Sequence, residues 1–188
     1  KSNAMCSVPH SSPSDHNASA VASTPKSRTH TDKARSDASE VDFDAVVVGA
    51  GFSGLYMLHR LRTLGLSARA FEKGDDVGGT WYWNQYPGAR CDVESMDYSY
   101  SFSDDIQQEW DWSERYPSQP EVLAYIRHVA DRLDLRRDIE FGACVERAHY
   151  DAEHHRWTIG VDTGGADTGG GDTGEEQTAR FLIMATGC

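Results

Sequence analysis

The sequence contains no apolar run that approaches the length of a membrane-spanning helix, and its N-terminus has no continuous apolar core. The first absence argues against a transmembrane segment, and the second argues against a secretory signal peptide. Basic residues are also scarce, because 18 Lys and Arg stand against 30 Asp and Glu, which gives a net charge of -12. A chain this acidic is poorly suited to bind nucleic acid or an anionic membrane surface, and nothing in it implies a partner protein.

Cysteine is rare, and its four positions are Cys6, Cys91, Cys144 and Cys188. They form no C-x-x-C pair, and none stands at a zinc-ligand spacing from one of the eight histidines. This pattern predicts free thiols and no metal site. Free thiols are typical of a reducing compartment, so with the missing signal peptide they favour a cytoplasmic location.

The N-terminal part of the chain is predicted to be a disordered tail. Residues 2–4, ahead of Met5, read as a remnant of an expression vector. Residues up to about 40 are mostly small or polar, and such a segment cannot bury enough surface to offset the entropy lost on ordering. We therefore expect residues 1–42 to lie outside a folded domain that spans residues 43–188.

The first stretch with a clear structural signal is a strand followed by a glycine motif. Residues 46–48 are three valines, a short β-branched run typical of a buried parallel strand. The next residues read G-x-G-x-x-G, with glycine at Gly49, Gly51 and Gly54. In a strand-to-helix turn over a dinucleotide, the first glycine makes the tight turn, the second admits the pyrophosphate, and the third lets helix and strand pack closely. The amides at the start of the helix then face the phosphates.

The surrounding sequence supplies the context that this motif requires. Apolar residues at helical spacing follow it, and Gly65 is placed to end that helix; the apolar residues are Met57, Leu58, Leu61 and Leu64. Residues 67–71 read as a second strand, which Glu72 closes 18 residues after Gly54, where a carboxylate accepts hydrogen bonds from a ribose. The alternative interpretation is a glycine-rich turn in some other kind of α/β protein.

A long aromatic stretch comes next. Gly78 and Gly79 form a second glycine pair, and aromatic residues are then dense from Trp81 to Trp112, with no helix expected before about residue 118. Long loops without secondary structure in compact domains are usually functional. Aromatic side chains that only cover a core would give the same pattern. From the residues alone, these two interpretations carry about equal weight.

The remaining sequence predicts one helix and a set of strands. Ser118 and Glu121 read as a capping box with Pro120 in the first turn, so a helix should follow and end near Asp134. Residues 162–176 repeat Asp-Thr-Gly and favour a flexible hairpin tip over a calcium-binding repeat. The predicted strands are residues 139–141, 144–150, 156–161 and 178–184. This order predicts an α/β sheet with right-handed crossovers and a β-meander.

Two further features separate this chain from a simple NAD dehydrogenase. The Gly78-Gly79 pair stands six residues after Glu72, and the last buried strand ends in Ala185, Thr186 and Gly187. This arrangement resembles flavoproteins with two dinucleotide-binding domains, of which the first binds FAD. The resemblance implies a Rossmann-like FAD-binding domain, with a central parallel sheet and a β-meander.

The resemblance becomes closer over residues 78–100. The runs GGTWYWN, YPGARCDVES and YSYSFS are similar to the N-terminal part of Baeyer–Villiger monooxygenases, and most similar to their phenylacetone and steroid monooxygenase branch. Members bind FAD and NADPH and insert one oxygen atom of O2 beside a ketone carbonyl, which gives an ester or lactone. The alternative with the same two dinucleotide-binding domains is a flavin enzyme that oxygenates nitrogen or sulfur, although the run YPGARCD fits such an enzyme less well.

The resemblance also implies roles for individual residues. Gly49 to Gly54 would hold the FAD pyrophosphate, Glu72 would bind a ribose, Val145 would lie near adenine, and Tyr98 would lie beside the flavin. The full set of implied cofactor contacts is Gly49, Gly51, Phe52, Ser53, Gly54, Glu72, Lys73, Gly79, Thr80, Trp81, Asp92, Tyr98, Val145, Ala185, Thr186 and Gly187.

Asp92 is the one catalytic candidate. The resemblance places it beside the flavin and the nicotinamide, where its charge would hold a cationic side chain near the reacting oxygen. The alternative is a structural turn in which Asp92 pairs with Arg90, and the residues alone favour that alternative.

Other family features do not occur in this sequence. The fingerprint F-x-G-x-x-x-H-x-x-x-W and a second G-x-G-x-x-G for NADPH are both missing. We therefore expect an N-terminal fragment that binds FAD weakly and does not oxidise NADPH by itself. A nucleotide-binding module without catalysis is the second hypothesis for the isolated chain.

Overall fold

The computed structural model describes residues 41–164 and 174–187. Within these ranges six strands form one sheet in the order β3-β2-β1-β6-β5-β4. They are β1 (Phe43–Val48), β2 (Ala68–Glu72), β3 (Ile139–Phe141), β4 (Cys144–Asp151), β5 (Arg156–Asp162) and β6 (Glu175–Met184). The first four strands of that order run parallel, whereas β5 is antiparallel to both β4 and β6. The predicted α/β fold, with a parallel sheet and a β-meander, is confirmed.

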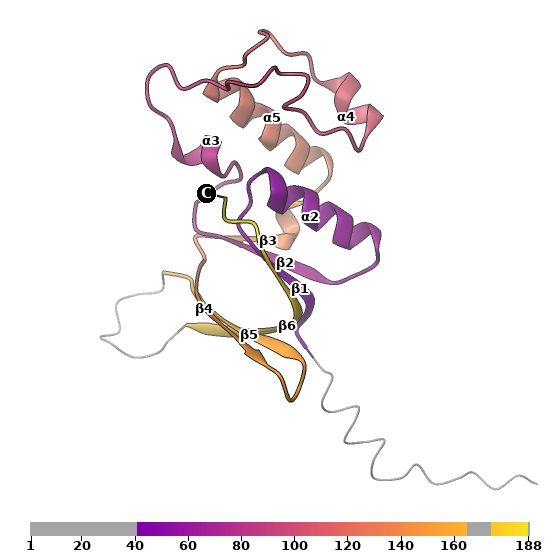
Figure 1. The fold of residues 1–188 in the computed structure, drawn as a ribbon, viewed down its shortest axis with the longest axis vertical. Helices are drawn as coiled ribbons and strands as arrows, with labels where there is room; N and C mark the ends of the chain where they lie inside the picture. The colour runs from indigo at the N-terminus through magenta and orange to yellow at the C-terminus, as the bar shows by residue number, and fades with distance from the viewer. Residues whose placement is uncertain (1–40, 165–173, 188) are drawn as a thin grey trace, which may run out of the picture.

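The helices gather on one side of the sheet, and the outer strands β4 and β5 curve away on the other (Figure 1). Helix α2 (Phe52–Thr63) connects β1 to β2. The other helices lie between β2 and β3 in the sequence: α3 (Thr80–Trp83), α4 (Asp104–Glu109), α5 (Gln119–Arg132) and the 3-10 helix η1 (Arg136–Asp138). Among the described residues, no helix is long and apolar enough to cross a membrane.

The alternation of side chains along β1 divides the core into two parts. Ala45 and Val47 pack in the cluster that includes α2 and α5, whereas Val46 packs with Ile159 and Val161 of the meander. All five side chains are almost completely buried. Because β1 is covered on both faces, its sequence has to be a continuous apolar run, which is the pattern that predicted it.

Helix α2 ends where the sequence predicts. Gly65 has a φ of 74°, and the amide of Leu66 reaches back to the carbonyl of Leu61 at 3.0 Å, as in a glycine-terminated helix. The prediction that Leu64 lies on the buried face is wrong, since Leu64 is 65% exposed. It is the C-cap residue, so the helical repeat no longer fixes the direction of its side chain.

Three other predictions need correction. The aromatic stretch contains α3 and α4 before residue 118, and Ser103 caps α4 by accepting a hydrogen bond from the amide of Ile106. The capping box of α5 is not formed, because Glu121 accepts hydrogen bonds from Ser113 instead. Asp42, predicted to lie in the tail, accepts hydrogen bonds from the amide and hydroxyl of Thr178 in β6.

Other predictions on the tail and the hairpin concern residues 1–40 and 165–173, which lie outside the described residues. His154 and His155 lie in the turn that joins β4 and β5.

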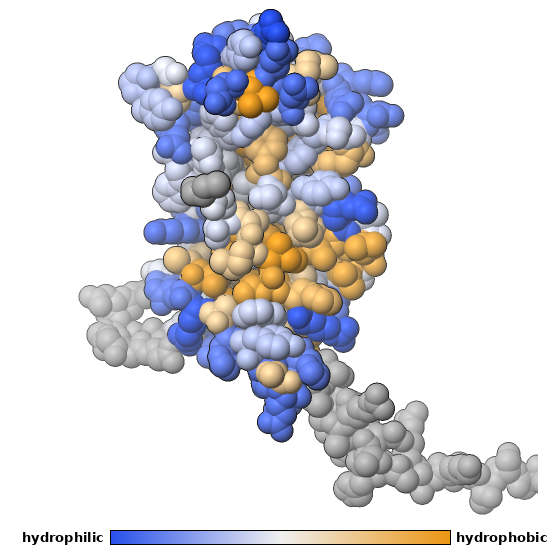
Figure 2. Space-filling model, viewed as in Figure 1, coloured by the Kyte–Doolittle hydropathy of each residue, from blue (hydrophilic) through white to orange (hydrophobic). Residues whose placement is uncertain are grey.

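One face of the molecule carries an apolar area near its middle (Figure 2). Large apolar side chains that remain exposed include Phe181 and Met184 of β6, at 56% and 63%, and Leu64 after α2. The prediction that the last strand is buried is therefore wrong for Phe181 and Met184. In parallel α/β sheets such side chains are normally covered by a further layer. Exposed apolar areas of this kind usually mark contacts with another protein surface.

Candidate functional site

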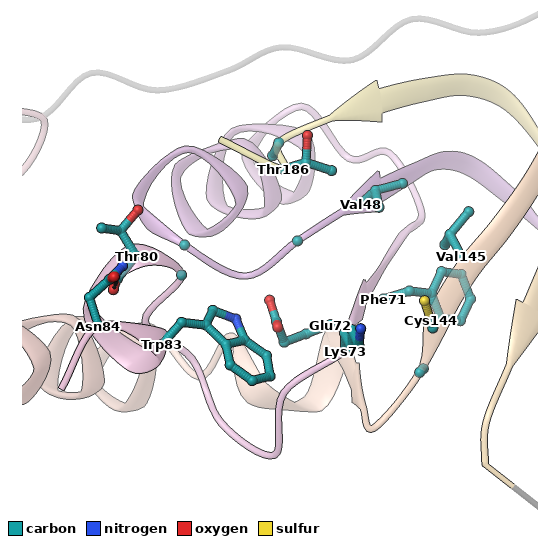
Figure 3. A pocket seen from close by; sticks show the side chains of 15 residues that line it. Val48, Phe71, Glu72, Lys73, Thr80, Trp83, Asn84, Cys144, Val145 and Thr186 are labelled. Atoms are coloured by element: carbon teal, nitrogen blue, oxygen red, sulfur yellow. Dashed lines mark hydrogen bonds between the residues drawn. The ribbon is translucent and has the colours of Figure 1, made fainter. Parts of the chain in front are cut away.

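A cavity of about 500 Å³ opens at the carboxyl ends of the parallel strands. In open α/β sheets this edge is where ligands bind. The ends of β1, β2 and β6 line the cavity together with α3 and the start of β4, so that segments distant in the sequence meet there (Figure 3). Its lining residues are Val48, Gly49, Gly51, Phe71, Glu72, Lys73, Gly79, Thr80, Trp83, Asn84, Ala143, Cys144, Val145, Ala185 and Thr186.

The three glycines of the G-x-G-x-x-G motif are required by the packing around them. Gly49 has a φ of 102°, and a Cβ there would lie 2.7 Å from the carbonyl oxygen of Ala185. A Cβ on Gly54 would lie 2.0 Å from the carbonyl oxygen of Gly49, because helix α2 and strand β1 approach closely there. Gly51 has the most room of the three, since its nearest neighbour would be the Cα of Gly79 at 3.3 Å.

The second glycine pair packs directly against the first turn. The amide of Gly78 donates to the carbonyl of Ala50 at 3.1 Å. A Cβ on Gly79, whose φ is 53°, would lie 2.9 Å from the Cα of Gly51. The two backbones therefore touch and form one continuous wall of the cavity without side chains, which is the kind of surface that a phosphate can approach closely.

Helix α2 begins at this wall. Its N-cap is Gly51, which has no side chain to accept hydrogen bonds from the first amides of the helix, and its first turn carries no acidic residue. The positive end of the helix therefore meets the cavity at Gly51 with no acidic side chain of its own first turn to neutralise it. Such a helix start suits an anionic group, above all a phosphate.

Glu72 at the end of β2 supplies the acidic side of the cavity. It is 5% exposed, and its two carboxylate oxygens accept hydrogen bonds from the amides of Ala50 at 2.7 Å and Gly74 at 2.8 Å. These bonds orient the carboxylate and link the first glycine turn to β2. A carboxylate has about four acceptor positions, so two remain for a ligand.

Trp81 and Tyr98 lie together behind this wall. The indole of Trp81 donates to the hydroxyl of Tyr98 at 2.9 Å, and the ring of Phe52 stands edge-on to Tyr98 at 5.0 Å. Trp81 is 8% exposed and belongs to the main core. Burial raises the pKa of Tyr98, and the charges of Cys91 and Asp92 raise it further, against the opposing hydrogen bond from Trp81. The phenol is therefore neutral at physiological pH.

Asp92 is exposed and stands close enough to Tyr98 for its charge to act on the phenol. The salt bridge of Arg90 is with Glu114, and the same guanidinium donates to the carbonyl of Tyr116. The turn alternative, in which Arg90 pairs with Asp92, is therefore wrong.

The cavity brings together many of the residues that the sequence predicts as cofactor contacts: Gly49, Gly51, Glu72, Lys73, Gly79, Thr80, Val145, Ala185 and Thr186. The remaining predicted residues do not line it. Gly54 packs beneath the turn, Trp81 and Tyr98 pack behind it, and Asp92 lies outside the cavity; Phe52, Ser53 and Gly187 are likewise absent from its lining.

Sequence reasoning missed several lining residues: Val48, Phe71, Trp83, Asn84, Ala143 and Cys144. Trp83 is the largest of these, is 57% exposed, and extends from α3 toward the side of the cavity where Glu72 lies (Figure 3). Trp81 and Trp83 stand two residues apart in a single-turn helix, so their side chains point to different sides. A helix predicted directly after Gly79 would therefore have separated Trp83 from the buried Trp81. No local sequence pattern indicates that Ala143 and Cys144 line the cavity. They lie there because the amide of Ala143 donates to the carbonyl of Glu72, which is distant in the sequence.

The glycine wall, the buried glutamate and the parallel sheet define a Rossmann-like nucleotide-binding domain. Residues 47–108 match the family model described as an NAD(P)-binding Rossmann-like domain. A phenazine N-monooxygenase of Lysobacter antibioticus is 48% identical over 152 residues, which are 80% of this chain and 26% of that protein. A Baeyer-Villiger monooxygenase of Pseudooceanicola batsensis is 46% identical over 147 residues, which are 78% of this chain and 25% of that protein.

Solved structures agree with these relatives. An oxidized steroid monooxygenase bound to NADP is 58% identical with a TM-score of 0.71, over 77% of this chain and 26% of that one. OTEMO in complex with FAD and NADP is 41% identical with a TM-score of 0.70, over 79% of this chain and 26% of that one. The chain belongs to the family of flavin-dependent monooxygenases that includes the Baeyer–Villiger enzymes. It spans about a quarter of the length of the curated relatives that it matches.

Proposed function

We propose that this chain is the FAD-binding part of an NADPH-dependent Baeyer–Villiger monooxygenase, which inserts one oxygen atom of O2 beside a ketone carbonyl to give an ester or lactone. The observation that carries the proposal is the cavity between the two glycine segments and Glu72. The identity to a Baeyer-Villiger monooxygenase supports the type of reaction. On this proposal the folded FAD-binding domain spans residues 43–188, and most of the NADPH site lies in sequence outside this chain.

The residues around the cavity fit a dinucleotide such as FAD. Side chains at Gly49, Gly51 or Gly79 would meet neighbouring backbone, so these positions carry none, and the wall that they form stays open to a pyrophosphate. The start of α2 offers amides for the phosphates, and Glu72 offers oriented acceptors for a ribose. Val145 and Cys144 lie at the far end of the cavity and suit the flat adenine ring (Figure 3).

When FAD is bound, it supplies the redox chemistry that activates O2. The role of this chain is to bind and orient the cofactor and to place Asp92 near the reacting centre. The two glycine segments form their part of the cavity wall from backbone alone, and the buried ring of Trp81 packs in the core behind them. A rigid wall keeps the cofactor in one position at little entropic cost.

One alternative reaction has its own support. The relative from Lysobacter antibioticus is named as an N-monooxygenase, and it is as similar to this chain as the Baeyer-Villiger relative. The cofactor cavity alone does not separate the two reactions, because both need the same flavin. An FAD-binding module without catalysis is the other alternative.

The location proposed for the complete enzyme is the cytoplasm. Cys91 and Cys144 are free thiols, which are typical of a reducing compartment. Its proposed substrates are a small ketone and O2.

The reaction is tested by supplying the complete enzyme with NADPH, O2 and either a ketone or a phenazine as the substrate. We expect NADPH oxidation to be coupled to ester or lactone formation when a ketone such as cyclohexanone or phenylacetone is supplied. A phenazine supplied in the same assay should give little N-oxide. Product analysis by mass spectrometry distinguishes the outcomes. Formation of N-oxide with no ester would favour the alternative reaction, and flavin without any oxygenated product would favour the non-catalytic module.

A further inference from the structure

Helix α3 carries one half of the cavity wall but is only a single turn long. A helix this short has no later turn to satisfy its carbonyl groups. The carbonyl of Trp81 is instead reached by the side-chain amide of Gln119, whose Nε2 donates to it at 2.5 Å. Gln119 is the first residue of α5 and is 7% exposed, so water has little access to either group.

A second link joins α5 to the other half of the wall. The hydroxyl of Tyr125 in α5 accepts a hydrogen bond from the backbone amide of Tyr100 at 2.8 Å. The hydroxyl of Tyr100 in turn donates to the carbonyl of Phe52 at 2.6 Å. Phe52 is the first residue of α2, directly after the G-x-G turn, and its ring packs on Tyr100 with a centroid distance of 5.0 Å.

The same helix also touches the point where the two glycine segments meet. A Cβ on Gly78 would lie 2.6 Å from a methyl group of Leu123 in α5. Tyr125 is 1% exposed and Leu123 is 6% exposed, so these contacts belong to the rigid core. The side chains of α5 therefore contact α3, Gly78 and the start of α2 from behind the wall.

We infer that α5 sets the relative position of the two glycine segments, and that Gln119 and Tyr100 are positioning residues for FAD. This inference rests on the proposed function. Neither side chain lines the cavity, so each acts through a backbone carbonyl that it holds. With the Gln119 bond removed, the buried Trp81 carbonyl has no partner, and α3 gains freedom to move Gly79 and Trp83 relative to Gly51.

Gln119→Met tests the first link, because methionine has a similar length and no donor. We expect the dissociation constant of FAD to rise about tenfold, as for one buried hydrogen bond that the bound state needs. The measurement is a titration of the complete apoenzyme with FAD, followed by flavin fluorescence, with the melting temperature of each apoenzyme recorded in parallel.

Two controls separate positioning from general destabilisation. Gln85→Met removes a similar bond, since Nε2 of Gln85 donates to the carbonyl of Tyr82 in the same helix at 2.7 Å, but in an exposed position. Val129→Ala creates a void in the buried face of α5, one turn beyond Tyr125, and it removes neither hydrogen bond. We expect both variants to keep the FAD dissociation constant within about twofold of the unmodified enzyme, although Val129→Ala lowers the melting temperature.

Tyr100→Phe is the second variant, because it deletes a single oxygen atom and tests the other link. We expect a rise of about fivefold in the same constant, and this variant decides the question if Gln119→Met does not fold. Unchanged FAD affinity in a folded Gln119→Met, or an equal loss in Val129→Ala, would overturn the inference. If the unmodified enzyme binds no FAD, the proposed function itself fails, which is a different result.

Discussion

Replacing Asp92 with alanine in the complete enzyme is expected to lower ketone oxygenation by about 100-fold or more while FAD content stays normal. The carboxylate of Asp92 is exposed, and the cation that could have used it structurally, Arg90, is paired with Glu114. We propose that its charge instead holds a cationic group beside the reacting oxygen. Loss of one such electrostatic group slows the reaction without disturbing the fold. The measurement is the rate of ester formation at saturating ketone.

Two matched variants serve as controls for this prediction. Asp97→Ala removes an exposed aspartate from the same stretch, and it should leave the rate almost unchanged. Glu114→Ala breaks the surface pair with Arg90, and it should change the free energy of unfolding by only about 0–1 kcal/mol. If Asp92→Ala retains nearly full turnover with normal flavin, Asp92 has no catalytic role.

The second large effect is expected for Gly51→Val, which should abolish FAD binding. A Cβ at this position points toward Gly79, 3.3 Å from its Cα, so the bulkier side chain of valine would push apart the two glycine segments that form the cavity wall. Gly51 is more informative than Gly54, since a side chain at Gly54 would collide with the Gly49 carbonyl and damage the fold itself. The measurement is the ratio of flavin to protein absorbance after purification.

Gly65→Asn is the control for this glycine variant. Gly65 also lies in a turn at the end of α2, with a φ of 74°, but a Cβ there meets no atom within 4 Å. Asparagine tolerates this backbone conformation, so flavin content should stay normal. A Gly51→Val enzyme that purifies with full flavin content would show that the pyrophosphate does not pass beside Gly51.

Much of the cofactor cavity could be predicted from the sequence because its requirements are local. The strand of valines, the spacing of three glycines and the acid at Glu72 each reflect a short segment of backbone. The structure agrees at Gly49, because its positive φ and its contact with Ala185 leave no room for a side chain. The hydrogen bonds that Glu72 accepts from the amides of Ala50 and Gly74 were not predictable from spacing, although the position of the acidic residue was.

The features that the sequence did not predict depend on contacts between distant segments. Ala143 and Cys144 reach the cavity only because the start of β4 crosses the end of β2. The partner of Arg90 is Glu114, 24 residues away, although Asp92 is much closer in the chain. Glu121 similarly bonds Ser113 rather than capping its own helix. In each case a tertiary contact prevailed over a local pattern.

The central claim is that the cavity between the two glycine segments binds FAD, and the most direct test is to identify the cofactor of the purified complete enzyme. Heat denaturation should release a yellow compound that chromatography identifies as FAD, at about one molecule per polypeptide if the site is a single Rossmann-like cavity. Release of NAD in place of FAD, or a colourless enzyme that takes up no FAD on titration, would contradict the account.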